Sequence, residues 1–87
     1  MEPKIDIDEL DKKMQDKGWE FLGPILHYEN AWKNQASIYK KKDKYVVSGI
    51  DSSGEKELFK SIPKKEAEKR LEESLIEIRK FIISASK

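Results

Sequence analysis

The stretch that decides the fold runs from Gln35 to Glu73, QASIYKKKDKYVVSGIDSSGEKELFKSIPKKEAEKRLEE. Two segments rich in β-branched and aromatic residues, 35–41 and 44–50, flank a tight turn at Lys42-Asp43 and form a predicted hairpin. The turn-forming run Asp51-Ser52-Ser53-Gly54 leads to a third predicted strand, 55–61. The hairpin register pairs Ile38 with Val47, and the whole stretch predicts three antiparallel strands followed directly by a helix.

The two faces of this predicted sheet differ in character because strand side chains alternate. One face carries Ala36, Ile38, Tyr45, Val47 and Gly49, and we assign it to the core, with Gly49 allowing a helix to approach closely. Phe59 is expected to join it. The opposite face is expected to be mainly polar and cationic, with fewer apolar residues, and it carries Ser37, Tyr39, Lys41, Lys44, Val46, Ser48, Lys56, Leu58 and Lys60.

A long amphipathic helix is predicted over 63–84, announced by Ser61 as a cap and Pro63 in the first turn. Its apolar residues step by four or three and form one stripe: Ala67, Leu71, Leu75, Ile78, Ile82 and Ala85. Ile76, Phe81 and Ile83 widen the apolar surface toward the C-terminus beyond what three strands need. Either the first helix packs there or another chain does, and we favour the first helix.

The first 34 residues predict a short helix and an edge segment. Asp6 or Asp8 caps a helix over 8–17, with Ile7, Leu10 and Met14 on one side and Gly18 ending it. Trp19 is expected to fold back onto Met14. Residues 19–28 are predicted to be a strand or irregular edge interrupted by Gly23-Pro24, and 29–34 a loop carrying Trp32. The prediction is a single α+β domain: an antiparallel three- to four-stranded meander packed on a long C-terminal helix, with a short N-terminal helix.

Composition narrows the function classes. The chain has 87 residues, 18 basic and 17 acidic, and no cysteine, which excludes disulfides, zinc–thiolate sites and cysteine nucleophiles. Its one histidine, His27, has no partner spacing typical of a metal site, and no glycine-rich phosphate loop occurs. We therefore expect no enzyme and no cofactor. The acidic N-terminus lacks a signal-peptide core and no apolar run reaches membrane-spanning length, so we expect a cytoplasmic protein.

Charge is concentrated in the strand region. Residues 35–65 hold eight lysines against four acidic residues. The polar sheet face is wide enough to enter a DNA major groove, so we expect duplex DNA as the ligand, contacted by Ser37, Tyr39, Lys41, Lys44, Lys56 and Lys60. Flanking phosphate contacts are expected from Lys40, Lys42, Lys64 and Lys65. The alternative is that these lysines simply solvate a small sheet.

The same stretch resembles the N-terminal DNA-binding domain of phage-type tyrosine integrases, the AP2-like module of three strands and a helix. The residues that carry the resemblance are Ser37-Ile38-Tyr39-Lys40, Lys42-Asp43, Asp51 with Gly54, Phe59-Lys60 and Lys64-Lys65-Glu66-Ala67. The resemblance implies DNA binding by a sheet in the groove, in a phage or mobile-element protein. The chain departs from it at Lys44 and Tyr45, where glycine and tryptophan are usual, and lacks the expected arginines.

Two other functions remain open beside DNA binding. A protein–protein module or small regulator would use the C-terminal helix, through Ile76, Phe81 and Ile83, or a sheet edge. The third possibility is an orphan domain without an identifiable ligand.

Overall fold

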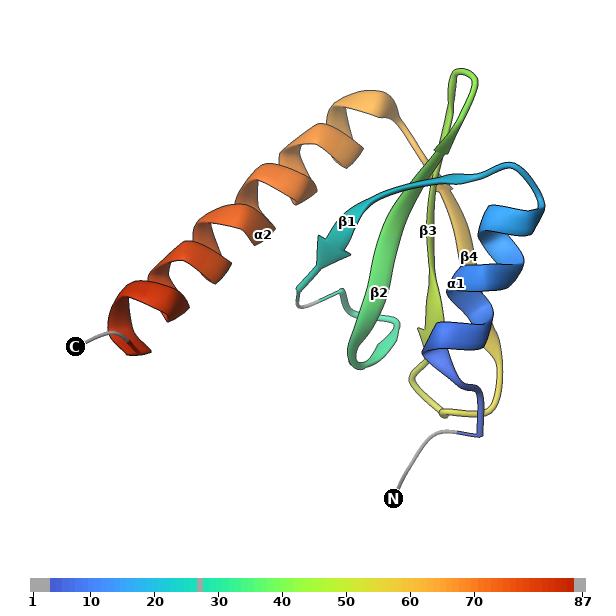
Figure 1. Cartoon of the computed structure of the whole chain (residues 1–87), viewed down its shortest axis with the longest axis horizontal. Coiled ribbons are helices and arrows are strands. Elements are labelled where there is room, and N and C mark those ends of the chain that lie inside the picture. The colour runs from blue at the N-terminus through green and yellow to red at the C-terminus, as the bar shows by residue number, and fades with distance from the viewer. Residues whose placement is uncertain (1–3, 27, 86–87) are drawn as a thin grey trace.

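Four antiparallel strands form a meander with one helix on each face (Figure 1). The computed structural model describes residues 4–26 and 28–85. The elements, in chain order, are α1 (Ile7–Asp16), β1 (Glu20–Ile25), β2 (Ala31–Lys41), β3 (Lys44–Asp51), β4 (Glu57–Ile62) and α2 (Lys64–Ala85). The predicted α+β class, with its meander, short first helix and long last helix, is confirmed. His27 lies outside the described residues.

The ends of α1 follow from local chemistry. The Asp6 side chain accepts a hydrogen bond from the Asp8 N–H (2.9 Å) and caps the first turn. At the other end the Trp19 N–H donates to the Met14 carbonyl (3.1 Å) and the Gly18 N–H to the Gln15 carbonyl (2.9 Å). Gly18 takes a left-handed φ of 91°. This is the Schellman ending expected from the sequence, and it brings Trp19 back onto Met14.

The central hairpin has the predicted register, with Ile38 opposite Val47 and Tyr39 opposite Val46. β2 starts earlier than expected, at Ala31, so Trp32 lies in a strand instead of a loop. The register between β2 and β3 shifts between Ala31 and Ala36. Gly49 is the residue of β3 that pairs with Ala36, next to this shift. A Cβ at Gly49 would lie 2.1 Å from the Gln35 carbonyl oxygen. The glycine therefore allows the close approach of the β2 backbone. The expectation that it allows the approach of a helix is wrong.

One prediction about the last strand is wrong. β4 places Lys60 opposite Val47 and Leu58 opposite Gly49, and residues directly opposite share a face. Leu58 and Lys60 therefore lie on the α2 side, whereas Phe59 lies on the α1 side against Trp19, with ring centroids 5.9 Å apart. Ser61 belongs to β4, and the Pro63 carbonyl accepts the first helical bond of α2, from the Ala67 N–H (3.0 Å).

The main core lies between the sheet and the first half of α2. It contains Ala36, Ile38 and Val47 of the face predicted from the hairpin, together with Ile25 of β1, Tyr28 between β1 and β2, Ile62 of β4 and Ala67 of α2. A second, smaller cluster lies on the other face and contains Met14, Tyr39 and Val46, with Trp19 packed against it. The first helix thus buries its apolar side against the sheet, not against the end of α2 (Figure 1).

Candidate interaction surface

The sheet face expected to bind DNA is not open, because α1 packs on it. Tyr39 is 3 % exposed and Val46 is 1 % exposed, and both lie beneath Met14 of α1. The periodicity correctly placed them on one face. This face is covered because α1 packs on the sheet and not on the end of α2, where we expected it. Tyr39 is therefore a structural residue and cannot contact a duplex in this conformation.

The Tyr39 hydroxyl is fastened to α1 by a hydrogen bond that it donates to the Asp11 carboxylate. Burial raises the pKa of Tyr39 well above its usual range, and the hydrogen bond and negative charge of Asp11 raise it further. The phenol of Tyr39 therefore stays protonated and links β2 to α1 through this hydrogen bond. This pairing of residues 28 positions apart is not visible in the local sequence pattern.

Lys41 also contacts the end of α1. Its ammonium group donates to the Lys17 carbonyl (2.8 Å), at the end of the helix, and lies 5.7 Å from the Trp19 ring centroid. Ser37 is half-buried in the middle of the sheet, between Pro24 of β1 and Ser48 of β3. Lys56 lies in the turn before β4, at the end of the sheet opposite the β2–β3 turn. The six predicted DNA contacts do not form one surface.

The predicted flanking lysines do come together at one end of the molecule. Tyr45 pairs with Ile62, which places the start of α2 beside the β2–β3 turn. Both reach the same end of the sheet in Figure 1. This basic end contains Lys40, Lys42, Lys44, Lys64 and Lys65. Lys40 lies 5.7 Å from the Tyr45 ring centroid, and Lys64 is 4.0 Å from Glu68.

α2 divides into two halves with different surroundings. In the packed half, residues 64–74, Ala67 is fully buried and the Ser74 hydroxyl donates to the Pro24 carbonyl (2.8 Å). A Cβ at Gly23 would lie 3.0 Å from Leu71 Cδ2, so Gly23 allows α2 to approach β1. The outer half, residues 75–85, runs beyond the sheet (Figure 1). The sequence indicates Gly23 only as an interruption of the strand, because the contact with Leu71 joins segments far apart in the chain.

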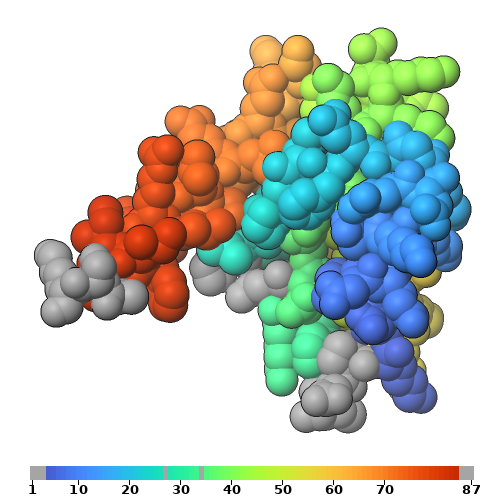
Figure 2. Space-filling model, viewed as in Figure 1, coloured from blue at the N-terminus to red at the C-terminus, as the bar shows by residue number. Residues whose placement is uncertain are grey.

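The outer half exposes large apolar side chains. Leu75 is 48 % exposed, Phe81 74 % and Ile82 59 %, and the segment stands out from the body of the molecule in Figure 2. Leu75 and Ile78, together with Leu71 and Ser74, line a groove of about 230 Å³ against Leu22, Gly23 and Pro24 of β1. We define this groove, extended by Phe81 and Ile82, as the inward surface of the outer half.

Ile76 and Ile83 belong to a different side of α2. An α-helix turns by about 100° per residue, so Ile76 lies about 160° around the axis from Ile78, and Ile83 follows Ile76 by two turns. The expectation that they widen the first stripe is wrong. They mark an outward surface, and Ile76 is 44 % exposed there. A helix that is apolar on opposite sides is normally enclosed by protein.

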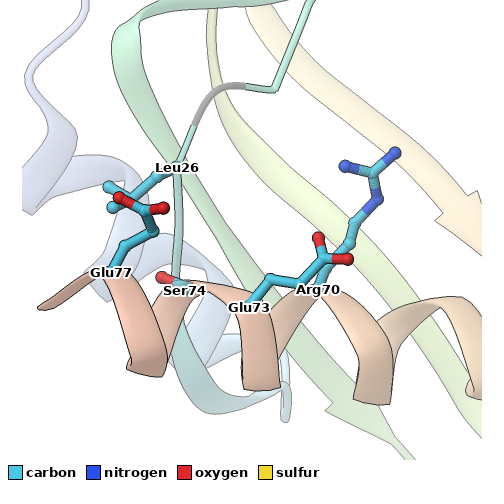
Figure 3. A pocket seen from close by; sticks show the side chains of 5 residues that line it. All are labelled: Leu26, Arg70, Glu73, Ser74 and Glu77. Atoms are coloured by element: carbon cyan, nitrogen blue, oxygen red, sulfur yellow. The ribbon is translucent and has the colours of Figure 1, made fainter. Parts of the chain in front are cut away.

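A second hollow, of about 260 Å³, lies between Leu26 and α2 (Figure 3). Arg70, Glu73, Ser74 and Glu77 line it from the helix. The Arg70 guanidinium contacts Glu66 (3.4 Å) and lies 5.0 Å from the Tyr28 ring centroid. Arg70 therefore makes an ion pair and a cation–π contact within the domain. The hollow is lined by one cationic and two acidic side chains beside Leu26 and Ser74.

Neither a metal site nor a membrane span is found in the described part of the chain. No group of three or more histidine or acidic side chains among residues 4–26 and 28–85 is arranged to hold a metal ion. No helix formed by these residues is long and apolar enough to cross a membrane. A scan against models of known protein families found no match, and searches of curated proteins and of solved structures found none either.

Proposed function

We propose that the chain is a non-enzymatic protein-interaction module that docks a partner on the inward surface of the outer half of α2. The observation that carries this proposal is the exposure of Leu75, Phe81 and Ile82 along the same stripe that buries Ala67. A contiguous apolar surface of this kind marks an interaction site in a small domain, because leaving it in water costs free energy.

The shape of the inward surface supports the proposal. The groove against β1 is lined mainly by apolar side chains and is bounded by Pro24, whose backbone has no N–H to donate at this edge. Phe81 stands past the groove and is the most exposed large apolar residue described. An aromatic anchor beside an apolar groove is typical of interaction hot spots. A helix or apolar segment of a partner would fill the groove and cover Phe81.

A photo-crosslinking experiment tests this function. A photoreactive phenylalanine derivative at Phe81 should give a specific adduct in cells of the native host, and the added substitution Ile82→Asp should abolish it. The matched control places the same derivative at Glu68, which is exposed on the packed half of α2. Adducts of equal yield from both positions, or from neither, would contradict the proposal.

DNA binding is the second candidate, and the basic end favours it. Five lysines from the β2–β3 turn and the start of α2 meet there, with Asp43 among them. In this second proposal the lysines at one end of the domain contact phosphates, instead of the contact by a sheet in the groove that the integrase resemblance implies. Fluorescence anisotropy with a generic duplex at low salt tests it. Binding should fall steeply with salt and be weakened by Lys42→Glu with Lys44→Glu, but not by Lys12→Glu in α1. No binding at low salt would remove the candidate.

A further inference from the structure

The outward surface of α2 carries a symmetric arrangement of charge around Ile76. Glu72 and Glu73 lie one turn before it, and Arg79 and Lys80 lie one turn after it. All four charged residues are exposed, and none is in an ion pair with another residue of the described chain. Ile76 is the midpoint of both the pair 72 and 80 and the pair 73 and 79.

This arrangement is self-complementary in one orientation. If two copies of α2 lie antiparallel about a two-fold axis at Ile76, Glu72 of each copy lies level with Lys80 of the other, and Glu73 with Arg79. The two Ile76 side chains then meet at the centre. A parallel arrangement would instead bring Glu72 beside Glu72 and Arg79 beside Arg79, where like charges repel. Two-fold contacts use the same surface twice, as this one does.

We propose that a second copy of this chain docks antiparallel on the outward surface, with the two-fold axis at Ile76. Because the sheet lies on the other side of α2, it does not obstruct this approach (Figure 1). Only about three helical turns meet, so the interface is small and the dimer is weak, dissociating in the micromolar range or above. The inference goes beyond the proposed function, since the inward surface stays available to a different partner.

Sedimentation over a range of protein concentrations tests the dimer. The wild-type chain should shift from monomer toward dimer, and Ile76→Glu should raise the dissociation constant at least about tenfold, because a charge replaces the central apolar contact. Glu68→Ala, on the packed half, should leave association unchanged. Wild-type protein that stays monomeric up to millimolar concentration overturns the inference. Loss of association through Phe81→Asp but not Ile76→Glu overturns it as well and points to the inward surface instead.

Charge reversal tests the orientation. The double variant E72K/E73K and the double variant R79E/K80E should each be monomeric, while the chain carrying all four changes should associate like the wild type. Tagged wild-type chain should not mix with the four-change variant, because antiparallel pairing then opposes like charges. Mixed dimers of these two chains would indicate parallel pairing and overturn the proposal. All four positions are exposed, and circular dichroism checks that each variant is folded.

The absence of cysteine allows a direct check by oxidation. Ile76→Cys should form a disulfide-linked dimer rapidly, because the axis brings the two positions 76 together. Glu68→Cys should not, since an antiparallel partner places its own position 68 about sixteen residues away along the helix, roughly 24 Å. Equal rates for both variants would contradict the antiparallel contact. Adducts from Phe81 with a foreign protein, together with a strictly monomeric purified chain, would leave the proposed function standing and remove this inference alone.

Discussion

The two halves of α2 carry one apolar stripe but meet different surroundings. Ala67 and Ser74 in the packed half are 0 % and 4 % exposed, whereas Phe81 and Ile82 in the outer half are 74 % and 59 % exposed. β1 and β3 cover the first half, whereas in the second half only the groove at Leu75 and Ile78 faces β1 and the remainder runs beyond the sheet. A hydrophobic stripe therefore predicts a helix and the side it buries, but not whether the cover lies in the same chain.

The largest difference between the halves should follow a buried charge. Ala67→Asp places a carboxylate in the core and should lower the free energy of unfolding by about 3 kcal/mol or more, because no partner compensates the desolvated charge. Ser84→Asp makes the same charge in the outer half and should change stability by less than about 0.5 kcal/mol. Urea titration of both variants measures the difference. Similar losses would show that the outer half is packed too.

Removing an apolar side chain should also affect the two halves of α2 differently. Leu71→Ala should cost about 2 kcal/mol, since Leu71 packs against the main core and leaves a cavity. Ile82→Ala should cost under about 0.5 kcal/mol in the monomer, because Ile82 is mostly in water. Thermal unfolding at low protein concentration compares them. A larger cost at Ile82 than at Leu71 would contradict the assignment of the two halves.

The boundary between the halves lies at Ser74. Its hydroxyl donates to the Pro24 carbonyl and fastens α2 to the edge strand. Ser74→Ala should cost about 1 kcal/mol and loosen the groove. Ser84→Ala, in the outer half, is the matched control and should be neutral. Chemical denaturation measures both, and an unaffected Ser74→Ala variant would mean that β1 does not hold the helix.

The contact on the other sheet face predicts a smaller, pH-dependent effect. Tyr39→Phe should cost up to about 1 kcal/mol at neutral pH by removing the hydrogen bond to Asp11. Because the folded state raises the pKa of Tyr39, its stabilisation is complete below the usual tyrosine value of about 10 and is lost as pH rises above it. Wild-type stability should therefore fall more steeply than that of Tyr39→Phe above pH 10. Stability that falls equally with pH in both proteins would contradict the buried hydrogen bond between Tyr39 and Asp11.

Much of the fold is predictable because its signals are local. The hairpin register follows from the turn at Lys42-Asp43 and from alternation, and both ends of α1 follow from Asp6 and Gly18. Pairings between distant segments are not predictable in this way. Nothing near Tyr39 indicates Asp11 as its partner, and the bulge opposite Gly49 depends on where β2 begins.

The candidate site was predictable only in part. The surplus of apolar residues at the end of α2 was visible in the sequence, and the turn of about 100° per residue already places Ile76 opposite Ile78. The DNA prediction counted lysines without knowing which face α1 would cover. The predicted faces of β4 were exchanged, because Phe59 was assigned to the main core. In the structure Leu58 packs against the main core and Phe59 lies on the other face.

The central claim is that the outer half of α2 is completed by another protein surface. Hydrogen exchange of the backbone amides tests it most directly, because an uncovered helix end opens locally and exchanges quickly. In dilute monomer, amides of residues 78–85 should exchange much faster than those of residues 68–74. Adding a captured partner should slow the first group alone. Equally slow exchange of both groups in dilute monomer would contradict the claim.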